Sequence, residues 1–264
     1  MTNPSNSRQI QVQPDLSLTV TEAGSGRPVL ILHGGAGPFS VAGIAQHIAS
    51  KARAITPTHP GWNGTHRPEW LTGVDDLAVA YLDLLEHEEL RDVLVIGSSI
   101  GGWIGAEMAV RDRGARISGL ILINAAGVAI EGQPMVDFFS LNPRAIAEHS
   151  FHEPDKFFRD PSTLPPEQVA AQRANIATLR LLSSDMQDPK LLRRLKNVRI
   201  PALAIWGESD RIIPPAYGKA YAAAFGNGRF ALVERAGHLP QLERPAETFA
   251  LIDQFPMGQA GWVP

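Results

Sequence analysis

The decisive stretch of this chain reads Asp92-Val93-Leu94-Val95-Ile96-Gly97-Ser98-Ser99-Ile100-Gly101-Gly102-Trp103. Its apolar, β-branched beginning is typical of a strand buried on both faces of a sheet. The strand ends in Gly-x-Ser-x-Gly, and apolar residues at helical spacing follow directly. A strand, a sharp turn and a helix form the setting in which this motif presents a serine as a nucleophile. Ser99 is therefore the candidate nucleophile, and an ordinary glycine-rich turn is the alternative.

Composition excludes several kinds of site and partner. The 264-residue chain contains no cysteine, which excludes disulfides, thiolate metal sites and a cysteine nucleophile. The formal net charge is −3 and no basic tract stands out, so we expect no binding to nucleic acid or to a membrane. The N-terminal residues are polar and lack the apolar core of a signal peptide, and no apolar run reaches membrane-spanning length. We therefore expect a cytoplasmic protein.

Strand patterns alternate with helical patterns along most of the chain. This alternation predicts an α/β fold with a mostly parallel, eight-stranded sheet and helices on both faces. The strands are expected at 10–12, 16–21, 28–32, 52–56, 117–123, 202–206 and 230–233, and in the apolar run that ends in Gly-x-Ser-x-Gly. The helices are expected at 41–50, 75–88, after residue 100, at 215–225 and at 246–255.

The alternation is interrupted between residues 128 and 198. This segment has no convincing buried strand, and it carries aromatic residues, prolines and helical patterns at 167–182 and 189–195. We interpret it as a helical cap insertion (128–198) in a core domain made of residues 1–127 and 199–264.

A serine nucleophile needs a base, and the base works best when a carboxylate orients it. Open parallel sheets build their sites at the carboxyl ends of the strands. Glu208 and Asp210 follow the strand 202–206, and His238 follows the strand 230–233. The order Ser99, Asp210, His238 is one in which such triads occur.

Four motifs, each after an expected strand, carry a family resemblance. They are His33-Gly34-Gly35-Ala36-Gly37, Gly97 to Gly102, Trp206-Gly207-Glu208-Ser209-Asp210 and Gly237-His238. Together they resemble the α/β-hydrolase superfamily over nearly the whole chain outside the insertion. The group with small caps includes carboxylesterases, meta-cleavage carbon–carbon hydrolases, enol-lactonases and cofactor-free haloperoxidases. The resemblance implies Ser99 as nucleophile, Asp210 as orienting acid and His238 as general base.

Each assignment has an alternative. Glu208 is the other candidate acid, and some relatives place the acid after the earlier strand, where this chain has the neutral Asn124. The resemblance implies that His33 braces the neighbouring glycine loop. For the remaining histidines we expect surface roles; these are His47, His59, His66, His87, His149 and His152.

The tetrahedral intermediate of acyl transfer needs two hydrogen-bond donors aimed at its oxygen. The family pattern implies that these are the backbone N–H groups of Ile100 and Gly35, with Ala36 as the alternative to Gly35. Tight turning between strand and helix also accounts for the glycines of this loop. No phosphate-loop, dinucleotide or metal-ligand pattern is present, so we expect no cofactor and no metal.

We expect an enzyme acting on a small molecule, and the sequence is compatible with a homodimer. The first hypothesis is hydrolysis of a small carboxylic ester or lactone through an acyl-enzyme on Ser99. The second is carbon–carbon bond hydrolysis of a meta-cleavage-type diketone, in which Arg173 would bind the substrate carboxylate; the alternative for Arg173 is a solvated helix position. Those enzymes usually have tryptophan after the histidine, where this chain has Leu239. The third is a ligand-binding receptor of the same fold.

Overall fold

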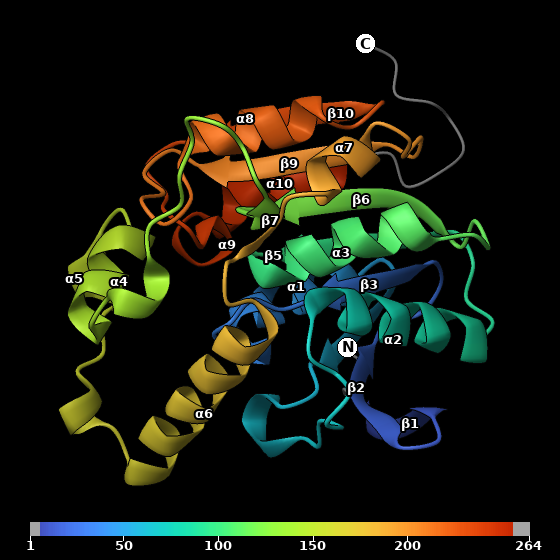
Figure 1. Cartoon of the computed structure of the whole chain (residues 1–264), viewed down its shortest axis with the longest axis horizontal. Helices are drawn as coiled ribbons and strands as arrows, with labels where there is room; N and C mark the ends of the chain where they lie inside the picture. Colours follow the sequence, from blue (N-terminus) through green and yellow to red (C-terminus); the bar gives the residue numbers. More distant parts are fainter. Residues whose placement is uncertain (1–5, 256–264) are drawn as a thin grey trace.

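An eight-stranded sheet forms the centre of the structure, a computed structural model that describes residues 6–255 (Figure 1). The strand order is β1-β2-β4-β3-β5-β6-β9-β10. β2 runs antiparallel to both neighbours, and the pairs from β4 to β10 are parallel. The mostly parallel, eight-stranded sheet is thus confirmed. The strands are β1 (Asn6–Gln13), β2 (Leu16–Ala23), β3 (Pro28–Leu32), β4 (Arg53–Thr58), β5 (Val93–Ser98), β6 (Ile117–Ile123), β9 (Ala202–Gly207) and β10 (Gly228–Val233).

Helices cover both faces of the sheet. Successive side chains of a strand point to opposite faces, so neighbouring residues such as Leu30 and Ile31 enter different apolar clusters. One face packs against α1 (Ala42–Ala49) and α10 (Pro245–Gln254). The other packs against α2 (Val74–His87), α3 (Ile100–Arg111) and α8 (Pro215–Ala223). β5 is buried along its whole length because both of its faces are covered.

The register brings the ends of five strands to one edge. Leu32 of β3 pairs with Gly97 of β5, and Ser98 pairs with Ile123 of β6. On the far side of β6, Ile123 pairs with Ile205 of β9, and Gly207 of β9 pairs with Val233 of β10. The loops that leave this edge carry the glycine-rich motif, the serine, the acid and the histidine.

The segment between β6 and β9 begins at this same edge, and its last part runs back over the core to the start of β9 (Figure 1). Its described elements are β7 (Gly127–Val128), η3 (Phe138–Ser140), α4 (Pro143–Ser150), α5 (Pro154–Phe157), η4 (Pro161–Thr163), α6 (Pro166–Leu182), β8 (Gln187–Asp188) and α7 (Leu191–Leu195). β7 and β8 form a parallel pair of two residues each, too short to produce a strand pattern in the sequence. We call residues 128–198 the insertion; its boundaries as a domain stay a prediction.

α6 is attached to the core near its C-terminal end. Its first half is exposed apart from the half-buried Val169, whereas Asn175, Leu179 and Leu182 are buried. Asn175 and Asn63 of η2 (Trp62–Gly64) hydrogen-bond reciprocally: Asn63 N–H donates to Asn175 Oδ1 at 2.9 Å, and Asn175 Nδ2 donates to Asn63 Oδ1 at 3.0 Å. The helix therefore stands on the loop after β4 and leaves its N-terminal half in solvent.

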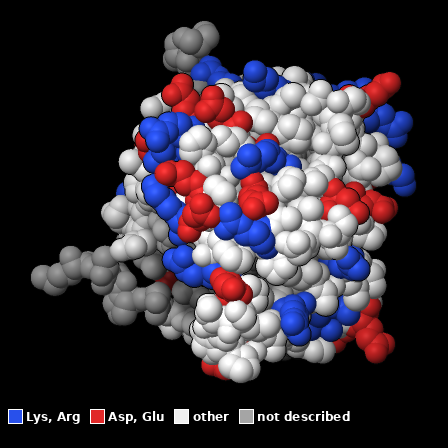
Figure 2. All heavy atoms as spheres, turned by 90° about the vertical axis from the view of Figure 1, so that its left-hand side faces the viewer, with Lys and Arg blue, Asp and Glu red and all other residues white. Residues whose placement is uncertain are grey.

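Charges of both signs are interspersed on the face of the molecule that carries the insertion. Figure 2 shows this face with lysine and arginine side chains next to aspartate and glutamate side chains. Several neighbours form ion pairs, among them Lys156 with Glu153 at 2.7 Å and Arg144 with Asp155 at 2.8 Å. No single sign of charge covers the visible part of this face.

Candidate active site

Ser99 occupies a strained turn between β5 and α3. Its backbone φ is 54° and ψ is −118°, in a region that non-glycine residues rarely adopt and that costs about 1–3 kcal/mol. A Cβ on Gly97 would lie 2.2 Å from Gly101 O, and a Cβ on Gly101 would lie 2.2 Å from Leu32 O. Both glycines are therefore required by the close approach of strand and helix, as the motif predicts.

The structure brings Ser99, His238 and Asp210 into one hydrogen-bonded chain. Ser99 Oγ lies 3.0 Å from His238 Nε2, and His238 Nδ1 lies 2.9 Å from Asp210 Oδ2. An ionised carboxylate can only accept hydrogen bonds, so Nδ1 carries the hydrogen and Nε2 is free to accept the serine proton. Ser99 is half-buried, while Asp210 and His238 are only 3% and 8% exposed. The arrangement is that of a nucleophile, a general base and an orienting acid.

The structure distinguishes between the two candidate acids. Asp210 Oδ1 accepts the backbone N–H groups of Ile212 at 2.8 Å and Ile213 at 3.0 Å, and Oδ2 faces the histidine. The exposed Glu208 instead accepts the backbone N–H of Arg235 at 3.1 Å. Asp210 is therefore the carboxylate that orients His238.

Asn124 is a site residue that sequence reasoning considered only as an empty acid position. Its Nδ2 donates to Asp210 Oδ2 at 2.6 Å, and its Oδ1 accepts the N–H of Gly207 at 3.2 Å. It follows β6, which lies beside β9, so its side chain reaches the acid loop. Because Asn124 donates to the oxygen that also faces His238, it holds the carboxylate in place and adds no charge.

The two segments that carry the expected oxyanion donors adjoin the serine. Ile100 is the first residue of α3, so its N–H has no partner within the helix. The glycine loop after β3 passes close to Ser99: a Cβ on Gly34 would lie 3.4 Å from Ser99 Cβ. A Cβ on Gly35 would lie 2.8 Å from Leu179 Cδ2 of α6. Gly35 thus lies between the serine turn and the insertion.

Buried, neutral side chains hold the glycine loop. His33 Nδ1–H donates to Gly34 O at 2.7 Å, and His33 Nε2 accepts the N–H of His59 at 3.0 Å. Trp62 Nε1–H donates to Gly35 O at 2.9 Å. The carbonyl of Gly34 and the N–H of Gly35 belong to one trans peptide and point in opposite directions, so fixing the first also aims the second.

The expectation of a surface role for His59 is wrong. His59 is fully buried, its Nε2–H donates to His33 O at 2.9 Å, and its Nδ1 accepts the hydroxyl hydrogen of Tyr81. Burial lowers the pKa of His59 to about 4 and the pKa of His33 well below its usual value. Both imidazoles are therefore neutral near pH 7, which suits the donor and acceptor pattern.

Arg173 lies on the exposed first half of α6, two residues before the buried Asn175. Its role as a ligand for a substrate carboxylate stays a prediction.

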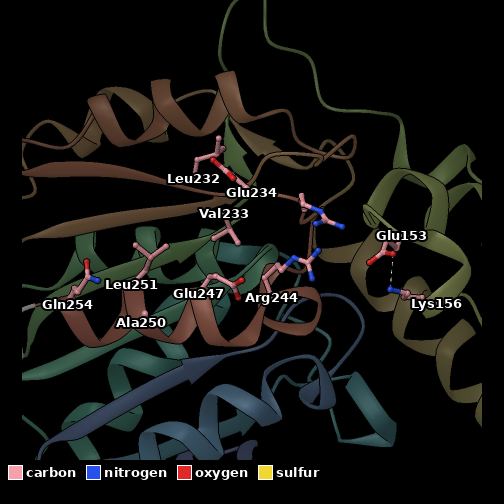
Figure 3. A pocket seen from close by; sticks show the side chains of 11 residues that line it. Glu153, Lys156, Leu232, Val233, Glu234, Arg244, Glu247, Ala250, Leu251 and Gln254 are labelled. Atoms are coloured by element: carbon pink, nitrogen blue, oxygen red, sulfur yellow. Dashed lines mark ion pairs between the residues drawn. The ribbon is translucent and has the colours of Figure 1, made fainter.

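A surface hollow of about 680 Å³ lies apart from the triad (Figure 3). It is bounded by the insertion on one side and by β10 and α10 on the other. Neither the serine nor the other triad residues contribute to its lining, which is mostly charged. Among residues 6–255, no three His, Asp or Glu side chains are grouped so that they would hold a metal ion. Within the same range no helix is long and apolar enough to cross a membrane.

The comparison with family models identifies the fold family. Residues 29–251 match the model described as the alpha/beta hydrolase family. The chain belongs to this family. The match contains the glycine loop, the serine turn, the acid loop and the histidine, which are the features that the sequence motifs predicted.

Individual relatives are distant but similar along most of their length. The chain is 23% identical over 248 residues to 2-hydroxy-6-oxo-6-(2'-aminophenyl)hexa-2,4-dienoic acid hydrolase of Metapseudomonas resinovorans, covering 87% of this chain and 83% of that protein. Among solved structures, a serine hydrolase involved in carbazole degradation has a TM-score of 0.77 at 21% identity, covering 95% and 97%. A thermophilic esterase of Thermogutta terrifontis has a TM-score of 0.70 at 22% identity, covering 95% and 97%. The structural likenesses show the shared fold.

Proposed function

We propose that this α/β hydrolase cleaves a small carboxylic ester or lactone through an acyl-enzyme on Ser99. One observation carries the proposal: Ser99 Oγ lies 3.0 Å from His238 Nε2, whose Nδ1 faces Asp210 at 2.9 Å. This is hydrogen-bond distance for transfer of the serine proton to the histidine. The strained turn and the burial of the acid and base keep the three groups in this arrangement.

The reaction has two halves. In the first, Ser99 Oγ attacks the ester carbonyl carbon as its proton passes to His238 Nε2, and the C=O electron pair moves to oxygen. Collapse of this intermediate breaks the C–O bond, and the alcohol leaves with the proton from His238. In the second, water attacks the acyl carbon and gives a proton to His238. The acid leaves, and Ser99 Oγ takes the proton back. Asp210 stabilises the imidazolium in both halves.

The N–H groups of Ile100 and Gly35 would stabilise the oxyanion. Each such donor contributes on the order of 100- to 1000-fold to the rate. The first is unpaired at the start of α3, and the second is aimed through His33 and Gly34. The N–H of Ala36 is the alternative second donor.

We assign the insertion the role of a cap above the serine. Leu179 of α6 reaches Gly35, and Phe138 and Phe139 are half-buried against the apolar core. Such apolar groups beside a few polar ones are typical of a small-molecule site. We therefore expect apolar acyl groups to be preferred.

The test is turnover of p-nitrophenyl acetate and butyrate by wild type and by Ser99→Ala. We expect measurable hydrolysis by wild type and a loss of at least about 10⁴-fold in Ser99→Ala. Ser50→Ala, at an exposed serine after α1, is the matched control and should keep the wild-type rate. Equal rates in wild type and Ser99→Ala would overturn the enzyme proposal and favour a ligand-binding protein.

Carbon–carbon bond hydrolysis is the second candidate, because the Metapseudomonas relative is named for a dienoic acid substrate. Two features of this chain weigh against it: Leu239 follows His238, and Arg173 is exposed. A panel of esters, lactones and 2-hydroxy-6-oxo-dienoates decides between the candidates. Fast loss of dienoate absorbance, with KM raised in Arg173→Gln for that substrate only, would favour the second candidate. Ester or lactone turnover without dienoate turnover would favour the first.

A further inference from the structure

The insertion is hydrogen-bonded to the loops that carry both the acid and the base. The N–H of His238 donates to Ser150 O at 2.6 Å, and the N–H of Arg211, next to Asp210, donates to His149 O at 3.0 Å. A Cβ on Gly237 would lie 2.2 Å from Ser150 O, so the two backbones are in direct contact. The position of the histidine loop therefore depends on residues 149–153 of the insertion.

The carboxylate of Glu243 adds hydrogen bonds to both sides of this contact. Glu243 is the last residue of α9 (Pro240–Glu243), five positions after His238. It accepts the N–H of Gly237 at 2.5 Å, that of His152 at 2.9 Å and that of Glu153 at 3.2 Å. One side chain thus joins the residue before the general base to two residues of the insertion.

Three inward-pointing N–H donors require an acceptor that carries no hydrogen of its own. An ionised carboxylate meets this requirement, whereas an amide of the same shape turns an NH₂ group toward at least one donor. Among the described residues Glu243 forms no ion pair with a lysine or arginine, so the backbone N–H groups are its electrostatic partners. Hydrogen bonds to a charged acceptor are stronger than those between neutral groups.

The contact lies beside solvent and outside the apolar core. Glu153 and Arg244, which adjoin the contact in sequence, line the open hollow of Figure 3. Glu243 itself is half-buried. A change of its charge therefore removes hydrogen bonds without opening a cavity in the core, and the variant is expected to fold.

We propose that Glu243 is a positioning residue for the general base. It clamps the His238 loop onto residues 149–153 of the insertion and so keeps Nε2 within reach of Ser99 Oγ. The inference rests on the proposed function, because it acts through His238. The side chain touches neither the substrate nor the reacting atoms, so its effect is on the alignment of proton transfer.

The test compares Glu243→Gln with Glu247→Gln on a p-nitrophenyl ester. Misplacement of a catalytic group by about 1 Å costs on the order of 100-fold, so we expect kcat to fall about 10- to 100-fold in Glu243→Gln, with KM changed less than about threefold. Glu247, an exposed glutamate of α10, lines the same hollow, and Glu247→Gln should retain wild-type kcat. Equal kcat in the two variants would overturn the proposal.

A double-mutant cycle tests whether Glu243 changes kcat by acting through His238. In a His238→Ala background, Glu243→Gln should lower the residual rate less than about twofold, because the group that it positions is gone. A further loss as large as that in the wild-type background would assign Glu243 a general structural role and overturn the proposal.

Circular dichroism would reveal whether Glu243→Gln fails to fold. A second variant tests the proposal in that case. Ser209→Ala removes the 2.7 Å hydrogen bond between Ser209 Oγ and His152 Nδ1, which joins the same segment to the acid loop. It should lower kcat in the same direction, by less, and again without effect in His238→Ala. A wild-type kcat here would count against the clamp. If Ser99→Ala is inactive while Glu243→Gln and Ser209→Ala are normal, only this inference fails.

Discussion

The groups on the two sides of Ser99 differ in chemical type. On the base side, charged or chargeable groups form a chain from Asp210 through His238 to the serine. On the oxyanion side, neutral groups act on backbone atoms: His33 and Trp62 hold the carbonyls of the glycine loop. The base side is hydrogen-bonded to the insertion through residues 149–153. The side chains that hold the oxyanion side come from the loop after β4 and from α2, and α6 of the insertion packs against that loop and against Gly35.

This difference separates two kinds of requirement. In the proposed mechanism the base side transfers a proton, so a change of charge or alignment there acts on the chemical step itself. The oxyanion side must hold donors still, so its parts are buried, uncharged and shared with the folded core. We therefore expect large catalytic effects with small stability effects on the base side, and the reverse on the oxyanion side.

Removing the charge of the acid is the largest expected effect among the tests of this comparison. Asp210→Asn keeps the shape but deprives His238 of the acceptor that sets its tautomer, and we expect kcat to fall about 10³- to 10⁴-fold. Glu208→Gln is the matched control, since the Glu208 side chain accepts the backbone N–H of Arg235 and lies apart from His238 in the hydrogen-bonded chain. The kinetics of p-nitrophenyl ester hydrolysis would measure the fall in kcat. A larger loss in Glu208→Gln than in Asp210→Asn would mean that the acid has been misassigned.

Asn124→Ala should have an intermediate effect. The variant removes the 2.6 Å bond to Asp210 Oδ2, while the acid keeps its bonds to the N–H groups of Ile212 and Ile213. We expect kcat to fall about 10-fold, since one neutral donor of several is lost. Asn197→Ala, at an exposed asparagine, is the control. A loss equal to that of Asp210→Asn would show that Asn124 does more than hold the acid.

Tyr81→Phe tests the oxyanion side. It leaves the buried Nδ1 of His59 without its donor, which should lower the free energy of unfolding by about 1–3 kcal/mol and kcat by only a few-fold. Tyr221→Phe is a matched control, because the buried hydroxyl of Tyr221 has no hydrogen-bond partner among the described residues. Denaturant titration measures both. Equal destabilisation by the two variants would contradict the proposed role of the Tyr81 hydroxyl.

The smallest expected effect is on stability alone, as the pH falls. Burial places the pKa of His59 at about 4, whereas an unfolded histidine has a pKa of about 6.5. The unfolded state therefore binds more protons between these values. The contribution is complete above about pH 6.5 and should decrease by about 2 kcal/mol at pH 5. The buried His33, whose pKa is also lowered, contributes to the same part of the stability profile. His59→Gln should therefore make this part less steep, and His66→Gln, at an exposed histidine, should leave it unchanged. A parallel profile for His59→Gln would show that His59 is not the group that titrates.

The sequence was sufficient where function depends on chain order and strand ends. The convergence of Ser99, Asp210 and His238 was predictable because each follows a buried strand, and parallel strands bring their ends to one edge. Asn124 was visible as a position, but its bond to Asp210 requires the adjacency of β6 and β9. The sequence around Asn124 does not reveal that β6 and β9 are neighbours in the sheet.

Other parts of the site depend on contacts between distant segments. His59 lies in a proline- and glycine-rich loop, which suggested exposure, yet α2 brings Tyr81 over it and buries it. Glu243 has no local pattern that marks it, since its partners come from residues 152, 153 and 237. The helical spacing around Arg173 predicted a helix correctly, and the structure places Arg173 at the solvated helix position that was the stated alternative to a ligand role.

The insertion leaves the sheet at the end of β6 and re-enters it through β9, two strands that pair directly. Because β6 and β9 are parallel, the chain leaves at one edge of the sheet and returns at the opposite edge, with α7 packed on the core between them. A graft of another hydrolase's segment that keeps α7 should therefore still fold onto the same scaffold. The carbonyl of Ser150 limits that freedom. Any transplanted segment must offer an acceptor to the amide of His238, and a chimera without one would keep its architecture but misalign the imidazole that drives turnover.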